Sequence, residues 1–249
     1  MRVLRKLVVG NWKMNGSMAQ LSELTQIGAA ARQASVDVGI AAPFTLIAPA
    51  VTRSGGLPIG AQDCHAESSG AFTGNVSVPM LKEVGARLVI VGHSERREYH
   101  RESDAEIRAK AEAALRAGLQ TIVCVGETDA QRQAGTAVEV VTGQLAGSLP
   151  DDWAEGELVV AYEPVWAIGT GKVATPDDVA EMHAAIRRNL VDRYGERGSR
   201  IRILYGGSVK AGNAAELFAV PNVDGALVGG ASLTAADFVP IVEAAAGRA

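Results

Sequence analysis

The sequence is poor in cysteine and has no long apolar run. Cys64 and Cys124 are its only cysteines, and no C-x-x-C pair occurs, so neither a disulfide framework nor a cysteine-based zinc site is supported. This cysteine usage is typical of a reducing compartment, and we expect the protein to be cytoplasmic. No stretch approaches about 18 uninterrupted apolar residues, so we expect no membrane span.

The sequence also lacks an excess of positive charge. It has 24 Lys and Arg against 28 Asp and Glu, a formal net charge of −4, so we expect neither nucleic acid nor an anionic membrane as a partner. Its 47% hydrophobic and 21% charged residues are ordinary for a globular protein. The 249 residues contain no linker-like stretch, and we expect one domain over residues 1–249.

Short runs rich in Val, Ile and Leu recur along the chain, and each is followed by a segment with helical patterning. The eight runs are Leu7–Asn11, Val36–Pro43, Pro58–Asp63, Arg87–His93, Thr121–Glu127, Leu158–Glu163, Arg200–Gly206 and Asp224–Gly230. Dividing 249 residues by eight gives about 31 per unit, the size of a βα repeat. The runs are almost continuously apolar, as strands buried on both faces of a parallel sheet are.

The segments between the runs carry helix-start signals. Ser17 with Gln20 and Ser103 with Glu106 have the spacing of a capping box, and Thr175 offers an N-cap followed by Pro176. Eight such units predict an α/β protein with a closed (β/α)8 barrel of eight parallel strands surrounded by helices. An open doubly wound sheet uses the same unit and is the alternative.

Polar or glycine-rich residues follow five of the predicted strands, at the end where a barrel carries its active site. These five segments are residues 10–13, 92–97, 162–166, 205–208 and 228–231. The glycine pairs after strands seven and eight are typical of a phosphate site built from backbone N–H groups. Taken singly, each pair could equally form a tight turn.

His93 and Glu163 form a possible proton-transfer pair. His93 precedes a predicted helix start, where the positive potential disfavours the imidazolium and leaves a neutral N–H donor. Glu163 ends strand six and Pro164 follows it, so we expect its carboxylate to point into the barrel mouth. The alternatives are a packed histidine and an ordinary solvated acid. Lys13 is the only obvious cation at the mouth, and it could simply pair with Glu95.

The loop of residues 166–174 has features of a lid. Trp166 and Ile168 on a loop with two glycines are costly unless the loop folds over a ligand, although a permanently docked loop is the alternative. The histidines show no metal-ligand spacing, so no metal is expected.

Over nearly its whole length the sequence resembles the triosephosphate isomerase family. Five motifs stand in the family's order, namely residues 11–15, 92–97, 161–171, 205–208 and 225–232. The resemblance implies a TIM barrel that interconverts dihydroxyacetone phosphate and D-glyceraldehyde 3-phosphate through an enediolate, without a cofactor. It makes Glu163 the base, His93 a neutral electrophile, Lys13 and Asn11 stabilisers of the enediolate and substrate, and Glu95 the residue that positions Lys13. It assigns the phosphate to backbone groups of Gly169, Ser208, Gly229 and Gly230.

The resemblance further implies a homodimer. The loop of residues 69–74 would reach the neighbouring subunit, where Thr73 would support Asn11 and Glu95 of that chain. Asn75 departs from the family, which typically has a glutamate there that pairs with the arginine matching Arg97. Two other readings stay open at this point: another sugar-phosphate enzyme on the same fold, and a catalytically silent phosphate-binding barrel.

Overall fold

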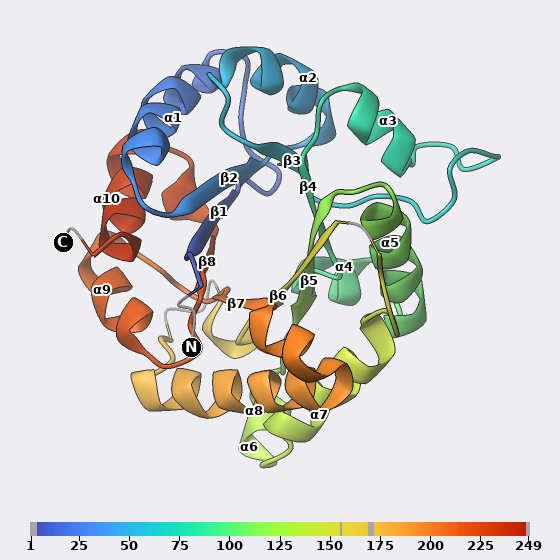
Figure 1. Ribbon diagram of the computed structural model, residues 1–249, viewed down its shortest axis with the longest axis vertical. Coiled ribbons are helices and arrows are strands. Elements are labelled where there is room, and N and C mark those ends of the chain that lie inside the picture. Colours follow the sequence, from blue (N-terminus) through green and yellow to red (C-terminus); the bar gives the residue numbers. More distant parts are fainter. Residues whose placement is uncertain (1–3, 155, 169–171, 248–249) are drawn as a thin grey trace.

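The computed structural model describes residues 4–154, 156–168 and 172–247, and in it eight parallel strands close into a barrel (Figure 1). The strands are β1 (Leu7–Asn11), β2 (Asp37–Ala41), β3 (Ile59–Ala61), β4 (Leu88–Val91), β5 (Gln120–Val125), β6 (Glu157–Tyr162), β7 (Arg202–Tyr205) and β8 (Gly225–Val228). Strand β1 pairs with β8 in the register Leu7↔Gly225 to Gly10↔Val228. This pairing closes the sheet, so the barrel is confirmed and the open sheet is excluded.

The strands are buried on both faces, as their apolar composition predicts. In β5, Ile122 and Cys124 belong to a core inside the barrel, whereas Val123 and Val125 belong to the core between the strands and the helices. Most of the predicted runs extend beyond the observed strands, because their polar and proline ends belong to the loops.

Helices surround the barrel (Figure 1). The α-helices are α1 (Glu23–Gln33), α2 (Phe44–Arg53), α3 (Val78–Glu83), α4 (Ser94–Tyr99), α5 (Asp104–Arg116), α6 (Asp129–Gln133), α7 (Ala137–Ser148), α8 (Pro176–Tyr194), α9 (Ala211–Ala219) and α10 (Ala235–Ala245). Short 3-10 helices are η1 (Gln20–Ser22), η2 (Val165–Ala167), η3 (Gly195–Arg200) and η4 (Gly230–Ser232). Capping boxes are present at Ser103 and Thr175, so these two predicted helix starts are confirmed. The predicted start at Ser17 is wrong: the Gln20 N–H donates to the Ser17 hydroxyl at 3.3 Å, but α1 begins at Glu23, after η1.

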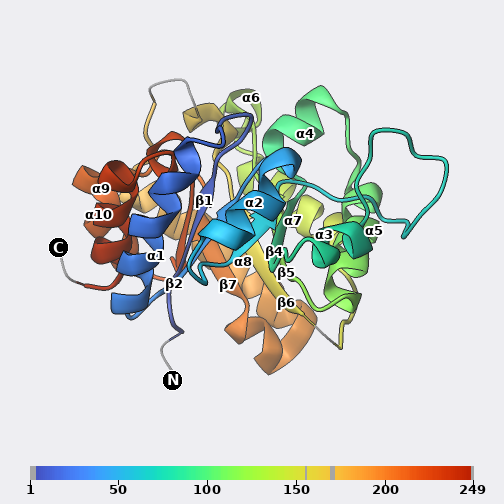
Figure 2. The same ribbon diagram turned by 90° about the horizontal axis from the view of Figure 1, so that it is seen from above.

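The two ends of the barrel differ in their loops (Figure 2). The short helices α4 and α6 lie at the end opposite the N-terminus, where the strands finish, and the segment between β3 and α3 projects outward. The carboxyl ends of the strands therefore bring the polar segments of the sequence together.

Within the described ranges, no helix has the length and apolar character needed to cross a membrane.

Candidate active site

A cavity of about 370 Å³ opens at the carboxyl end of the barrel. Its walls include Asn11, Lys13, His93, Glu163, Ser208, Gly229 and Gly230, which come from the ends of β1, β4, β6, β7 and β8. Seven of the nine residues expected at the site therefore share one cavity. Glu95 does not line this cavity but contacts Lys13, which does. Gly169 lies outside the described residues.

Glu163 occupies the buried side of this cavity, and its side chain is 2% exposed. It follows β6 directly, and a Cβ atom at Gly206 would lie 3.0 Å from its Cγ, so the glycine leaves room for the carboxylate. Oε1 lies 2.8 Å from Nε2 of His93, and Oε2 accepts a hydrogen bond from the Ser94 N–H at 2.9 Å. Burial raises the pKa of Glu163, but His93 and the Ser94 N–H together lower it by more, so the net shift of this pKa is downward.

His93 faces Glu163 from the first residue before α4. Its Nδ1 accepts a hydrogen bond from the Glu95 N–H at 3.2 Å. A ring nitrogen that accepts carries no proton, so the proton of a neutral ring sits on Nε2 and points at Glu163.

The direction of the His93 pKa differs from the prediction based on its helix position. Burial lowers this pKa, but the carboxylate of Glu163 raises it more, and the net shift is upward. The helix position explains why the Glu95 N–H meets Nδ1, but it says nothing of the carboxylate that comes from β6.

Lys13 approaches the cavity from β1 with an unusual backbone. Its φ is 49°, in the left-handed region that costs a non-glycine residue about 1–2 kcal/mol. The Oδ1 atom of Asn11 accepts a hydrogen bond from the Lys13 N–H at 3.0 Å, which supports this conformation. The ammonium Nζ lies 2.7 Å from Oε1 of Glu95. The expected pairing of Lys13 with Glu95 is therefore present, and it holds the ammonium beside His93 and Glu163.

The glycine pairs after β7 and β8 have different structural reasons. A Cβ atom at Gly207 would lie 2.2 Å from the Tyr205 hydroxyl, so packing alone requires glycine there. A Cβ at Gly230 would meet nothing within 4 Å, and one at Gly229 only Lys13 Cε at 3.6 Å. The space beside these two residues is the cavity itself, and the 3-10 helix η4 begins there. Open backbone at a helix start suits an anion.

The segment after Glu163 is held by a buried carboxylate that the sequence patterns did not reveal. Glu127 is 0% exposed, and its Oε1 accepts hydrogen bonds from the Tyr162 hydroxyl at 3.0 Å and the Trp166 indole at 2.7 Å. Arg132 stacks over the Trp166 ring at 4.7 Å and contacts Glu127 at 3.4 Å. Glu127 therefore contacts residues on both sides of Glu163. The sequence signal that could have singled out Glu127 is a carboxylate placed just after the apolar strand β5.

No cluster of three or more potential metal ligands occurs in the described part of the chain. A parallel barrel with a buried carboxylate, a histidine in contact with it and an open glycine backbone in one cavity defines a TIM-barrel enzyme that performs acid–base chemistry on an anionic substrate.

Comparison with known proteins identifies the family. The family model described as triosephosphate isomerase matches residues 6–245. A protein named triosephosphate isomerase from Ruegeria sp. (strain TM1040) is 59% identical over 242 residues, covering 97% of this chain and 98% of that protein. One from Xanthobacter flavus with the same name is 55% identical over 242 residues, covering 96% and 97%. The crystal structure of triosephosphate isomerase from Bartonella henselae has 47% identity and a TM-score of 0.90, covering 97% and 99%.

The chain belongs to the triosephosphate isomerase family. It is therefore an isomerase that interconverts triose phosphates. The resemblance seen in the sequence is confirmed.

Proposed function

We propose that Glu163 and His93 carry the proton transfers of this isomerisation. Glu163 removes a proton from C1 of dihydroxyacetone phosphate, which gives an enediolate. It then delivers the proton to C2 of the enediolate, which gives D-glyceraldehyde 3-phosphate. The hydroxyl proton moves from O1 to O2 in the same turnover, and the Nε2 proton of His93 serves this exchange. No electrons leave or enter the substrate, so the reaction needs no redox cofactor.

The observation that carries this proposal is the single oriented N–H of His93. Its Nε2 lies 2.8 Å from Oε1 of Glu163, while the Glu95 N–H occupies Nδ1. A substrate whose oxygens meet Nε2 would separate the two side chains and remove the contact that raises the pKa of His93. The ring then donates as a neutral imidazole, and the carboxylate stands free to accept a carbon-bound proton.

Lys13 and the glycine backbone supply the electrostatic part of the proposal. The ammonium of Lys13, with the Asn11 side chain beside it, would stabilise the negative charge of the enediolate, and Glu95 positions that ammonium. Backbone groups of Ser208, Gly229 and Gly230 would hold the phosphate, together with Gly169 from beyond the described residues. The open space at Gly229 and Gly230 supports this assignment.

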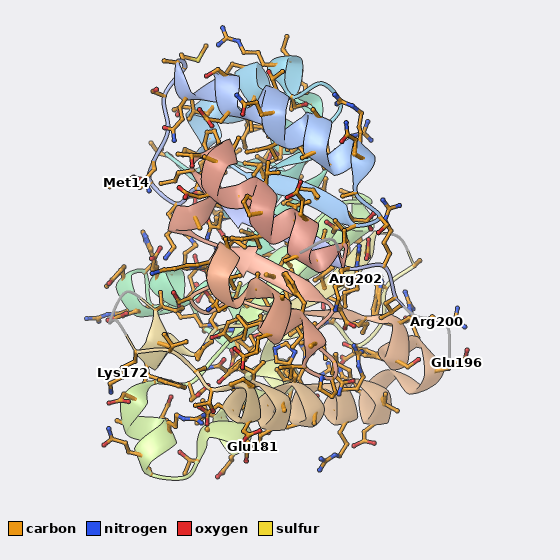
Figure 3. All side chains as sticks on the ribbon, turned by 90° about the vertical axis from the view of Figure 1, so that its left-hand side faces the viewer. Met14, Lys172, Glu181, Glu196, Arg200 and Arg202 are labelled. Atoms are coloured by element: carbon orange, nitrogen blue, oxygen red, sulfur yellow. The ribbon has the colours of Figure 1, made fainter. Side chains whose placement is uncertain are left out.

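The test is the rate of glyceraldehyde 3-phosphate isomerisation, measured with glycerol-3-phosphate dehydrogenase and NADH. Loss of the base in Glu163→Gln is expected to lower kcat by at least about 10²–10⁴-fold. Glu181→Gln is the matched control, since Glu181 is exposed on α8 (Figure 3) and does not line the cavity. A folded Glu163→Gln variant as active as Glu181→Gln would refute the proposal.

We further propose that the chain acts as a homodimer through the loop containing Thr73. This loop projects from the barrel between β3 and α3 (Figures 1 and 2). Beside the active site, a second cavity of about 300 Å³ is lined by Asn11, Glu95, Met14 and Tyr99, the last two of which are 96% and 72% exposed. Such apolar exposure supports a contact with a second copy.

The departure at Asn75 is compatible with a dimer. Arg97 donates to Asp104 and to the Ser148 hydroxyl within its own chain, so it needs no glutamate from a partner. We expect the mass of a dimer in light scattering at micromolar concentration, and a lower mass for Thr73→Arg. A fully active protein at the monomer mass would contradict this expectation.

We also propose that residues 1–249 function as one domain in the cytoplasm. The closed barrel, in which β1 and β8 pair, supports the single domain. Cys64 and Cys124 are free and buried, which supports a reducing compartment.

A further inference from the structure

The cavity contains a second cation that the sequence patterns did not single out. Lys210 lines the same cavity as Lys13, Ser208 and Gly229. Its side chain is exposed, and among the described residues no carboxylate lies within ion-pair distance of it. We propose that Lys210 is a specificity-determining residue that attracts the dianionic phosphate of the substrate and favours dianionic over uncharged substrates. This inference rests on the function proposed above.

The charges at the cavity show why a second cation matters. With His93 neutral, the charged groups of the wall are Lys13, Lys210 and Glu163. Glu95 offsets the charge of Lys13, since their charged atoms are 2.7 Å apart. Without Lys210 the local sum is one negative charge, from Glu163, and a dianion would be repelled. Lys210 brings this sum to zero, so the site no longer opposes the approach of phosphate.

The backbone of Lys210 is fixed while its side chain remains available. The Lys210 N–H donates to Oδ1 of Asn213 at 2.8 Å, and Nδ2 of Asn213 donates to the Ser208 carbonyl at 3.1 Å. Asn213 thereby pins the segment that connects the expected phosphate ligand Ser208 to Lys210. Helix α9 begins at the next residue, and its first N–H groups add positive potential.

The two lysines therefore have different roles. The ammonium of Lys13 is held by Glu95 and lies next to the reacting groups, whereas that of Lys210 has no such partner among the described residues. An exposed charge acts over about one Debye length, roughly 8 Å at physiological ionic strength, so its effect on an approaching dianion is sensitive to salt. Lys210 should act on substrate capture, and so on kcat/KM, more than on kcat.

The experiment compares Lys210→Gln with Arg188→Gln, which removes the same charge from an exposed position on α8 remote from the cavity. For Lys210→Gln we expect kcat/KM to fall about three- to tenfold at low ionic strength, and the loss to shrink as salt is added. The inhibition constant of sulfate, a divalent anion probe, should rise by a similar factor. Arg188→Gln should stay within about twofold of the wild type throughout.

Further variants separate charge from structure. Lys210→Arg keeps the charge and should restore kcat/KM, while Lys210→Glu should reduce it by more than Lys210→Gln does. Turnover of glyceraldehyde, which has no phosphate, should be equal in Lys210→Gln and the wild type. A loss that is equal for both substrates, or that is independent of salt, would overturn the proposal.

The outcome also distinguishes this inference from the proposed catalytic roles. If Glu163→Gln abolishes turnover while Lys210→Gln matches Arg188→Gln at every salt concentration, only the role of Lys210 fails. If Glu163→Gln remains fully active, the catalytic assignment fails, whatever Lys210→Gln does.

Discussion

The two ends of the barrel both carry buried or half-buried charges, but they use them differently. Figure 3 shows Met14 and Lys172 toward one end and Arg202 toward the other. At the amino end, Arg202 is 6% exposed and lies between strands, donating to Asp37 at 2.7 Å and to Glu157 at 2.9 Å. Each of these charges is satisfied by the protein itself.

At the carboxyl end, charged groups also contact one another, but they do so beside an open cavity. In the proposed function the contact between His93 and Glu163 opens when a substrate binds, and the glycine backbone beside them faces open space. Charged groups whose partners all belong to the protein therefore serve stability. Charged groups whose partner a substrate could replace are available for catalysis. Two buried histidines, His93 and His183, test this contrast.

The largest expected effect is that of His93→Gln on the reaction. Glutamine can still donate a hydrogen bond but cannot exchange a proton with the substrate, so kcat should fall about 10²–10⁴-fold. The rate is measured in the coupled assay, and thermal unfolding reports whether the variant is folded. His183→Gln is the matched control, because His183 lies on the buried face of α8 and does not line the cavity, and its kcat should stay near the wild-type value. Equal losses in both variants would remove the distinction between a histidine whose partner a substrate can replace and one whose partners are all internal.

The next effect is the response of stability to acid. His183 is fully buried and its Nδ1 donates to the Asn222 carbonyl at 3.0 Å, while burial lowers its pKa from 6.5 to about 4. The folded state therefore keeps this ring neutral where the unfolded chain would bind a proton. The contribution of His183 to the free energy of unfolding is therefore complete above pH 6.5 and is lost as the pH falls from 6.5 to about 4. At 1.36 kcal/mol per pKa unit, the loss is about 3 kcal/mol in total.

Denaturant unfolding across this pH range measures the effect. His183→Gln preserves a donor but does not titrate, so the difference in unfolding free energy between it and the wild type should change by this amount. If this difference in unfolding free energy stays constant from pH 7 to pH 4, burial does not lower the pKa of His183 and the prediction is wrong. The activity ratio of the two proteins should remain flat over the same range.

The sequence predicted the fold more completely than the site's electrostatics. Apolar runs, capping boxes at Ser103 and Thr175, and glycine pairs are local signals, and each is visible within a few residues. Counting eight units favoured a closed barrel, and the pairing of β1 with β8 then excluded the open sheet built from the same unit. These features required no knowledge of what lies across the sheet.

Long-range contacts were not predictable in the same way. Glu163 meets the N–H of Ser94, which is 69 residues earlier, and this contact and that with His93 set the pKa directions of the pair. Glu127 binds Trp166 across 39 residues. Lys210 joins the cavity only because β7 lies next to β8 in the closed barrel. Such distances depend on strand tilt and side-chain rotamers, which a one-dimensional pattern does not contain.

The smallest expected effect is that of Arg202→Met at the amino end. Loss of the guanidinium leaves Asp37 and Glu157, whose side chains are 42% and 48% exposed and thus accessible to water, and Asp37 keeps its pair with Arg5 at 3.1 Å. The cost should therefore be about 2 kcal/mol of unfolding free energy, below the 3–5 kcal/mol typical of breaking a deeply buried pair. Arg200→Met, at a side chain 70% exposed, is the control and should change stability by less than about 0.5 kcal/mol. Both variants should keep the wild-type kcat/KM, because neither residue lines the catalytic cavity. A large fall in kcat/KM for a stably folded Arg202→Met variant would show that the two ends are coupled, and the division of charge between stability and catalysis would then be wrong.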